Sequence, residues 1–214
     1  MRNSYAVLLT FFVLLGVMAS TGCDAEENRS AKSSPAAQIE MLDKATMDQL
    51  SAQMEPSEPH GLLSELAGAW DYELKYRSKR DAKPQLSTGR IEYEPVLGNK
   101  FIFGENLAHL NIGGESIPYK SWAILGYDTH KNAYTSVLLD AMRTDISTGT
   151  GQYNEKRDVL EETGSFAHPL TGEEKTYRSE LQFKDDNTHS QSVFITDGSG
   201  KEFKVLEIEF RRSE

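Results

Sequence analysis

The fold is decided by one stretch of the sequence, residues 126–153, which reads GYDTHKNAYTSVLLDAMRTDISTGTGQY. It contains the end of one β-rich run, a polar turn, a second run that ends at Asp140, a short turn and a third run. Gly149 and Gly151 inside the third run indicate a bend in a strand, because no helix follows them as a nucleotide-binding loop would require. Short β-rich runs joined by turns predict an antiparallel meander.

The same pattern extends in both directions, from Trp70 to Arg212. Gly, Pro, Asn and Asp divide this region into about ten β-rich runs, the pattern of an all-β sandwich or barrel. The runs cover residues 69–78, 86–95, 99–110, 115–127, 132–140, 143–153, 157–166, 174–184, 188–197 and 201–212. Short gaps favour antiparallel neighbours. We therefore predict an all-β fold, an antiparallel barrel of about ten strands within residues 60–214.

Several runs alternate between apolar and polar residues. Tyr72, Leu74 and Tyr76 alternate with charged residues in the first run, and residues 174–184 follow the same pattern. One face of each of these strands is therefore buried and the other is exposed to solvent, as the wall of an antiparallel barrel requires. The alternation places Arg178 on the outer face.

Residues 36–59 are predicted to form a helix and a linker before the barrel. Apolar residues recur there at helical spacing, and we expect them to pack against the barrel. These residues are Ile39, Leu42, Met47, Leu50 and Met54. Pro56 and Pro59 end the helix.

Residues 60–67 are predicted to form a short helical turn directly before the first strand. Leu62, Leu63 and Leu66 recur at a spacing that lets them plug one end of the barrel. His60, at the start of the turn, is expected to be solvated.

The first 22 residues are typical of a signal peptide. Arg2 precedes an apolar run, residues 6–17, which is shorter than the roughly 20 residues of a membrane-spanning helix. Small residues then precede Cys23, as in a bacterial lipobox, so we expect an exported lipoprotein that faces the periplasm or the cell surface. Acyl chains on Cys23 would bind the lipid bilayer, and the polar residues 23–35 would form a flexible tether. An ordinary signal peptide with an incidental cysteine is the alternative.

Composition excludes several other classes. The net charge of −10 argues against a nucleic-acid partner, which would require clustered Lys and Arg. Cys23 is the only cysteine, so neither an intrachain disulfide nor a zinc site built on cysteines can form.

No catalytic residue, metal site or cofactor is predicted, and an enzymatic activity remains open. The sequence has no nucleophile elbow, and the adjacent carboxylates Glu161 and Glu162 point to opposite faces of a strand. Among the histidines, His109 and His189 lie in strands. Each either faces the lumen, as a haem ligand or general base, or is a surface or satisfied strand histidine.

Five further residues are candidates for ligand binding. Trp70, Trp122, Tyr127 and Tyr134 are aromatic side chains that either line a cavity or belong to the core. Asp140 ends a strand whose same-face residues include Tyr134. Its carboxylate either orients a ligand at the barrel rim or accepts hydrogen bonds from the turn that follows.

Several of these motifs resemble known families. Residues 68–70, Gly-Ala-Trp, resemble the first strand of calycin barrels such as lipocalins and nitrobindins. Residues 126–128, 138–140 and 149–153 are similar to a bacterial family known as domain of unknown function 1579, and residues 168–172 and 207–210 also fit that family. The resemblance covers residues 60–212.

The resemblance implies a ten-stranded lipocalin-like barrel in an exported or cell-associated bacterial protein, and it implies no reaction. By analogy of fold, we expect the barrel to bind a small hydrophobic ligand. One alternative is a structural or interaction module of the cell envelope with a filled barrel. Another is a haem-binding barrel of the nitrobindin type.

The anchor is tested by the substitution Cys23→Ser. Without an acylated cysteine, the protein should leave the membrane fraction, because acyl chains supply the membrane affinity. Fractionation of the producing cells with an antibody against the barrel measures this. A Cys23→Ser variant that stays in the membrane fraction would refute the lipid anchor.

Overall fold

The computed structural model describes residues 43–168 and 171–213. Two helices, α1 (Lys44–Met54) and α2 (Glu58–Ser64), precede ten strands. The expected signal peptide, the tether and the first part of the expected helix lie outside the described residues. Within the described part of the chain, no helix is both long enough and apolar enough to cross a membrane.

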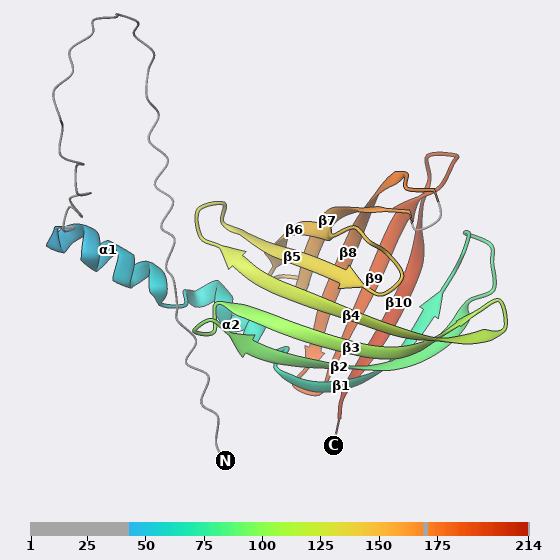
Figure 1. The fold of residues 1–214 in the computed structure, drawn as a ribbon, viewed down its shortest axis with the longest axis horizontal. Coiled ribbons are helices and arrows are strands. Elements are labelled where there is room, and N and C mark those ends of the chain that lie inside the picture. Colours follow the sequence, from blue (N-terminus) through green and yellow to red (C-terminus); the bar gives the residue numbers. More distant parts are fainter. Residues whose placement is uncertain (1–42, 169–170, 214) are drawn as a thin grey trace, which may run out of the picture. The chain divides into compact units, whose positions relative to one another are not determined.

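The ten strands form a closed barrel in which each strand pairs with its neighbours in sequence and β10 pairs with β1 (Figure 1). All pairs are antiparallel. The strands are β1 (Gly68–Tyr76), β2 (Gln85–Val96), β3 (Phe101–Ile112), β4 (Glu115–Asp128), β5 (Ala133–Asp140), β6 (Ser147–Asn154), β7 (Val159–Ala167), β8 (Glu174–Asp185), β9 (Thr188–Thr196) and β10 (Glu202–Arg212). The predicted meander is confirmed, and the largest boundary difference is that β6 begins at residue 147 instead of 143.

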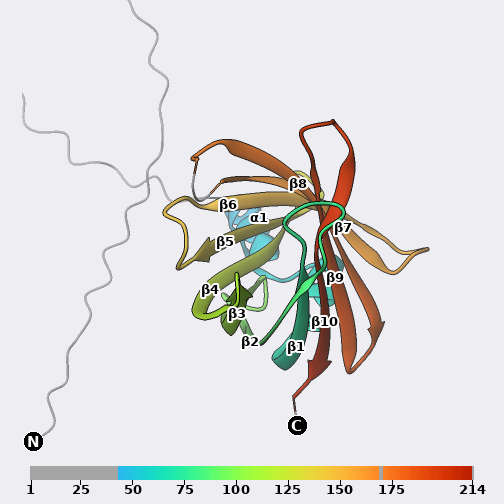
Figure 2. The same cartoon turned by 90° about the vertical axis from the view of Figure 1, so that its right-hand side faces the viewer.

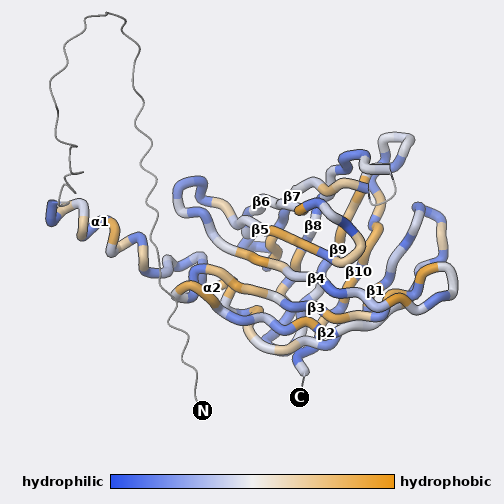
Figure 3. Tube along the Cα trace, in the orientation of Figure 1, coloured by the Kyte–Doolittle hydropathy of each residue, from blue (hydrophilic) through white to orange (hydrophobic). Residues whose placement is uncertain are grey.

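The inner face of the barrel carries the predicted apolar set. Trp70, Tyr72 and Leu74 on β1 are buried, and they join Ile91, Ala108 and Phe210 in one cluster. The charged residues between them on β1 lie outside, as predicted. Figure 3 shows the same division along the chain, since the β1–β2 connection is hydrophilic while the strands carry apolar positions. Burial of one face therefore holds the wall together.

Helix α2 closes one end of the barrel. Leu63 and Leu66 are 2% and 1% exposed, and Leu63 packs with Tyr134 and Leu160 from the barrel wall. The Trp70 indole Nε1 donates a hydrogen bond of 2.7 Å to the Leu66 carbonyl, which joins the plug to β1. The prediction that these leucines seal one end is confirmed. Figure 2 shows the ring of strands from the opposite end, where the β1–β2 and β9–β10 connections lie.

The expectation that His60 is solvated is wrong. His60 is 4% exposed because it takes part in the cap of α2: its Nδ1 accepts a hydrogen bond of 2.9 Å from the Ser57 backbone N–H. Its ring lies edge-on to Tyr127, with 5.8 Å between the centroids. The cap thus turns the imidazole towards the barrel, where it belongs to the plug.

Helix α1 begins with Asp43, whose carboxylate accepts a 2.7 Å hydrogen bond from the Thr46 backbone N–H. None of its residues is buried, and Met47, Leu50 and Met54 are at least 43% exposed. The expected packing of this stripe against the barrel is therefore absent among the described residues. The narrow stripe on one face has too little apolar area to hold the helix in place.

Gly149 and Gly151 leave room for groups on the neighbouring strands. The strand register of β6 is regular through both residues. A Cβ at Gly149 would overlap the Glu162 carboxyl group and would lie 2.7 Å from Ser136 Oγ. A Cβ at Gly151 would lie 2.5 Å from the Glu161 carbonyl oxygen. The glycines are therefore explained by close approach of neighbouring groups, where the sequence suggested a bend.

Candidate functional site

The inner wall becomes progressively more accessible away from α2. On β3, Ile102 next to the plug is 1% exposed and Ala108 is 6% exposed, whereas Ile112 at the far end of the strand is 37% exposed. On β1, Trp70 is 2% exposed, and Tyr76 at the far end is half-buried. One end of the barrel is thus sealed and the other is open to solvent.

The accessible wall also extends into the middle of the barrel. Val193 pairs with Leu206, and Leu206 and Ile208 pair with the inward-facing Tyr76 and Leu74 of β1, yet all three residues are only half-buried. A barrel packed solidly with side chains would bury such mid-strand residues, because protein interiors leave almost no gaps of the size of water. Space for solvent therefore reaches into the lumen beside β9 and β10.

Two inward-facing tyrosines are enclosed by the barrel: Tyr93 lies opposite Gly68 next to the sealed end, and Tyr119 lies opposite Ala108 farther along. Tyr93 and Tyr119 face inward and are half-buried by accessible surface. Burial raises the pKa of Tyr93 well above its usual range. Burial, followed by the charge of Asp140, raises the pKa of Tyr119 to about 12. Both hydroxyls remain protonated at neutral pH and can donate hydrogen bonds into the lumen.

An ion pair builds the rim of the open end. Arg143, in the turn after β5, directs Nε and Nη2 at the same Asp140 oxygen, Oδ2, each at 2.6 Å. Asp140 Oδ1 accepts a 2.9 Å hydrogen bond from the Met142 backbone N–H, and Arg143 Nη1 donates to Ser147 Oγ at 2.8 Å. The side chains of Asp140 and Arg143 are only 5% and 10% exposed. The predicted turn-capping role of Asp140 is confirmed, and its role in ligand binding stays a prediction.

A second polar group lies on β7 and β8. The Tyr177 hydroxyl donates a hydrogen bond of 2.7 Å to Glu162 Oε1. Burial, followed by the Glu162 charge, raises the pKa of Tyr177. The directly paired glycines Gly149 and Gly164 lie beside these two side chains and leave space for them.

A third polar group is internally satisfied. The Tyr72 hydroxyl donates to Asn106 Oδ1 at 2.8 Å, and Asn106 Nδ2 donates to Ser121 Oγ at 3.0 Å. All three residues are buried. Because the amide is paired on both sides, this group stabilises the wall and offers little to a ligand.

Four of the predicted site residues lie at the sealed end. Trp70 and His189 pack together with ring centroids 4.3 Å apart, and Tyr127 and Tyr134 pack together at 4.9 Å. The Tyr134 hydroxyl donates to the Pro59 carbonyl at 3.0 Å. These residues serve the core and the α2 plug, whereas the predicted Asp140 lies at the other end of the barrel.

His109 and Trp122 do not face the lumen, so of the two alternatives for His109 the surface position is the one observed. His109 follows the buried, inward-facing Ala108 and is exposed on the outer face. Trp122 follows the buried Ser121, is 45% exposed, and donates from Nε1 to Glu105 Oε1 at 3.1 Å. The inward position of their neighbours forces both residues outward. Outward-facing Arg178 agrees with its prediction and pairs with Glu202 at 2.8 Å.

His189 is enclosed without a polar partner. It is 2% exposed, stacks on Phe210 at 4.3 Å, and neither ring nitrogen makes a hydrogen bond. Burial, aided by the charges of Arg212 and Lys184, lowers its pKa to about 3. A haem iron would need one ring nitrogen to face open space, and both are covered. This arrangement fits a neutral core histidine and does not favour haem.

Arg143, Glu162, Tyr119 and Tyr177 were missed as site residues. The sequence could have identified Glu162 and Tyr177, because the alternation of faces along a strand places each of them on the inner face. Arg143 had none, because its turn was expected to be part of a strand. Across residues 43–168 and 171–213, no cluster of His, Cys, Asp and Glu could hold a metal ion.

The outer surface has two shallow grooves. One, of about 660 Å³, crosses β6 to β10 and is lined by threonines and by Arg178. The other, of about 850 Å³, lies over β10 and β1 to β4, and its lining includes the charged residues Asp71, Glu73 and Arg90. Tyr177 lines the first groove and Tyr119 lines the second, whereas Arg143 and Glu162 line neither.

Comparison with known proteins identifies one family. The family described as protein of unknown function (DUF1579) matches residues 55–212. No curated protein sequence matches the chain.

Two solved structures are similar. Rv2717c from M. tuberculosis is 16% identical with a TM-score of 0.56, and the match covers 75% of this chain and 100% of that one. The S-type phycobiliprotein lyase CPES from Guillardia theta is 11% identical with a TM-score of 0.50, and the match covers 78% of this chain and 97% of that one. At these identities the likeness extends to the fold alone.

The buried His189 predicts a pH dependence of stability. The pKa of His189 is about 3 in the folded chain and 6.5 ordinarily. Between these two values the histidine is protonated in the unfolded chain and neutral in the folded chain. Stability is therefore lost as the pH falls below 6.5, by about 1.4 kcal/mol per pH unit.

Urea unfolding at about pH 7.5 and about pH 5 measures this loss in the wild type and in His189→Leu. Between these two pH values, the free energy of unfolding of the variant should fall by about 2 kcal/mol less than that of the wild type. His109→Leu, on the outer face, should behave as the wild type. Equal losses in all three proteins would contradict the enclosed histidine.

Proposed function

We propose that this chain, which belongs to the DUF1579 family of proteins of unknown function, binds a small, largely apolar molecule inside its barrel. The observation that supports the proposal is the change in burial along the inner wall, from 1% exposure at Ile102 beside the plug to 37% at Ile112. A lumen that is sealed at one end and open at the other is the shape of a binding site for a small molecule.

The two sides of the lumen differ in chemistry. The apolar side consists of half-buried residues on the strands around β1 and β10: Tyr76, Leu110, Val193, Leu206 and Ile208. The polar side carries Tyr119, Arg143, Glu162 and Tyr177. An apolar wall with a few convergent polar groups is the usual composition of small-molecule sites, in which the polar groups fix the orientation of the ligand.

The energetics require both sides. A ligand that buries about 200 Å² of apolar surface gains roughly 5 kcal/mol. Association costs at least about 4 kcal/mol in lost translational and rotational freedom. Apolar contact alone therefore gives little net affinity, and hydrogen bonds from the polar side would decide which molecules bind.

The similar structures support this proposal only through the fold. One of them is a phycobiliprotein lyase, so a barrel of this shape occurs in a protein with an activity of its own. We carry over neither that activity nor its substrate, because a fold does not determine a function.

The proposed binding protein works at a membrane surface. In this proposal Cys23 is acylated, residues 23–35 form the tether, and the barrel faces the periplasm or the cell surface. A tethered barrel with an open lumen could hold an apolar molecule that leaves or enters the bilayer.

A second candidate is an interaction module of the cell envelope. It is favoured by apolar side chains on the outer face of β3 and β4, where Leu107, Trp122 and Ile124 are 55%, 45% and 37% exposed. Exposed apolar residues that gather on one face are typical of contact surfaces. In this case the outer face would carry the function, and the lumen would not.

Two substitutions on β3 distinguish these candidates. Leu110→Trp fills the lumen, whereas Leu107→Trp adds the same side chain to the outer face of the same strand. Titration with the neutral fluorescent probe N-phenyl-1-naphthylamine measures binding. We expect Leu110→Trp to weaken binding by about tenfold or more, because it removes the space for the probe, and Leu107→Trp to leave it unchanged.

Circular dichroism melting confirms that both variants fold. Unchanged binding by Leu110→Trp, or equal loss in both variants, would contradict the luminal site and favour the interaction module.

A further inference from the structure

We infer that the luminal site selects a ligand with a cationic amine, which is held by the carboxylate of Glu162. The inference rests on the proposed function, since it names the polar end of a ligand whose apolar part occupies the lumen. It derives from the position of Glu162, its partners, the glycines beside it and the charges around it.

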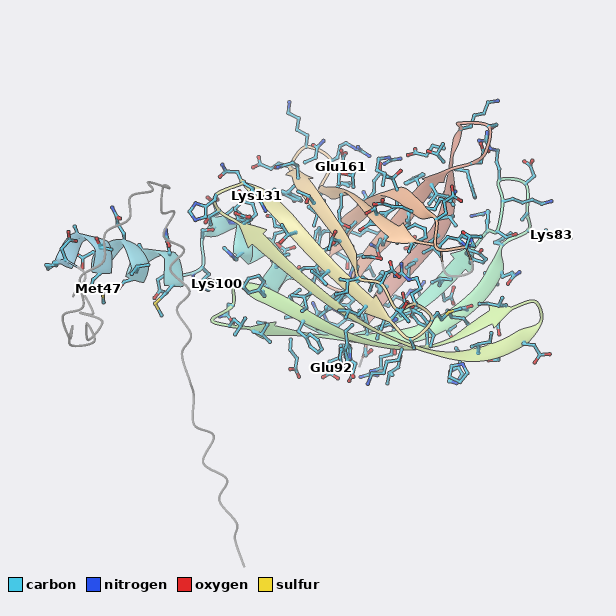
Figure 4. The ribbon with its side chains drawn as sticks, turned by 45° about the horizontal axis from the view of Figure 1, so that its top comes forward. Met47, Lys83, Glu92, Lys100, Lys131 and Glu161 are labelled. Atoms are coloured by element: carbon cyan, nitrogen blue, oxygen red, sulfur yellow. The ribbon has the colours of Figure 1, made fainter. Side chains whose placement is uncertain are left out.

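Glu162 faces inward in the middle of the barrel wall. It pairs in register with Gly151 on β6 and with the buried Ser179 on β8. Its neighbour Glu161 points outward, as Figure 4 shows, and forms an ion pair with Arg157. The two adjacent carboxylates thus have different surroundings.

Glu162 has a neutral partner and no counter-ion. The Tyr177 hydroxyl donates to its Oε1 at 2.7 Å, and no ion pair to Glu162 forms within the described part of the chain. Arg143, the cation at the rim, is already held by Asp140 at 2.6 Å and lies 3.7 Å from Asp145. A carboxylate in a partly desolvated lumen is stabilised by a positive donor, which the ligand would supply.

Two glycines make room for this carboxylate and for its tyrosine partner. Gly149 and Gly164 are paired directly across β6 and β7. A Cβ at Gly149 would overlap the Glu162 carboxyl group, and a Cβ at Gly164 would lie 2.6 Å from the Tyr177 ring. Any larger residue at either position would push these two side chains from their places. The glycines therefore maintain the arrangement of carboxylate and hydroxyl.

The charges and acceptors of the lumen favour a donor. The cations near this carboxylate already have carboxylate partners: Arg143 pairs with Asp140 at 2.6 Å, and Lys175, on the inner face of β8, pairs with Glu173 at 2.7 Å. Gln85, which faces inward opposite Tyr76, has a buried Oε1 that accepts no hydrogen bond. Negative charge and an unpaired acceptor repel an anionic head group and attract an ammonium group.

The apolar part of such a ligand has a continuous path. Glu162 lies in register with Ser179, then Val193 on β9 and Leu206 on β10. Val193 and Leu206 are half-buried apolar residues. An alkyl chain can therefore lie on β9 and β10 while its amine meets Glu162, so the chemical class is an alkylamine.

Three probes with the same chain test the inference: dodecylamine, dodecanol and sodium dodecanoate. Each competes with N-phenyl-1-naphthylamine for the full chain at neutral pH, below its micellar concentration. We expect dodecylamine to bind at least about tenfold more tightly than dodecanoate, because only the amine makes a charge-assisted hydrogen bond to Glu162.

Glu162→Gln keeps an acceptor for Tyr177 and removes the charge. It should weaken dodecylamine binding by about tenfold and leave dodecanol within about twofold. Glu161→Gln, on the outer face of the same strand, should change neither value.

The outcomes are distinct. If none of the three probes displaces the fluorescent probe, the proposed function itself fails. If the probes bind but dodecanoate binds as tightly as dodecylamine, or Glu162→Gln weakens all three equally, luminal binding stands and the amine inference is overturned. Should Glu162→Gln fail to fold, the order of the three probes on the wild-type chain still decides the question.

Discussion

The contact between α2 and the first strand is the constraint on which the rest of the structure depends. Leu63 and Leu66 fill one end of the barrel, and the Trp70 indole is hydrogen-bonded to the Leu66 carbonyl at 2.7 Å. Burying two leucines contributes about 3 to 6 kcal/mol, a large part of the marginal stability of a domain of this size. The plug also determines which end of the barrel is open, because a closed wall with one sealed end has only one entrance for solvent and ligand.

Because α2 seals only one end of the barrel, the other end is open, and most of the polar and charged side chains of the lumen lie towards it. The core at the sealed end consists of aromatic and aliphatic side chains, together with the His60 cap and the enclosed His189. Towards the open end, the inner wall contains tyrosines, the buried ion pair between Asp140 and Arg143, and Glu162. Buried polar groups are costly unless they are paired, so a carboxylate without a counter-ion is expected at a site of function rather than in a core.

Much of the fold could be predicted from the sequence, because strand alternation and turn residues are local signals. The faces of β1 and the leucine plug are examples. The positions of His109 and Trp122 could not, since β3 and β4 carry apolar residues on both faces: Leu107 and Trp122 outside, Ala108 and Leu110 inside. Where both faces are apolar, the pairing across the closed barrel decides which one is inner. Arg143 was missed because the sequence assigned it to the start of the next strand, whereas it lies in the turn between β5 and β6.

Chemical accessibility along the inner face of β10 tests whether the lumen is open beside this strand and sealed at the α2 end. Since Cys23 is the only cysteine, a Cys23→Ser background allows single cysteines to be placed along the inner face of β10. The rate of alkylation by iodoacetamide then reports access to each position. An open lumen predicts fast reaction at Leu206→Cys and Ile208→Cys, and slow reaction at Phe210→Cys, where the native residue is 5% exposed. Protection of Ile208→Cys equal to that of Phe210→Cys would contradict an open lumen.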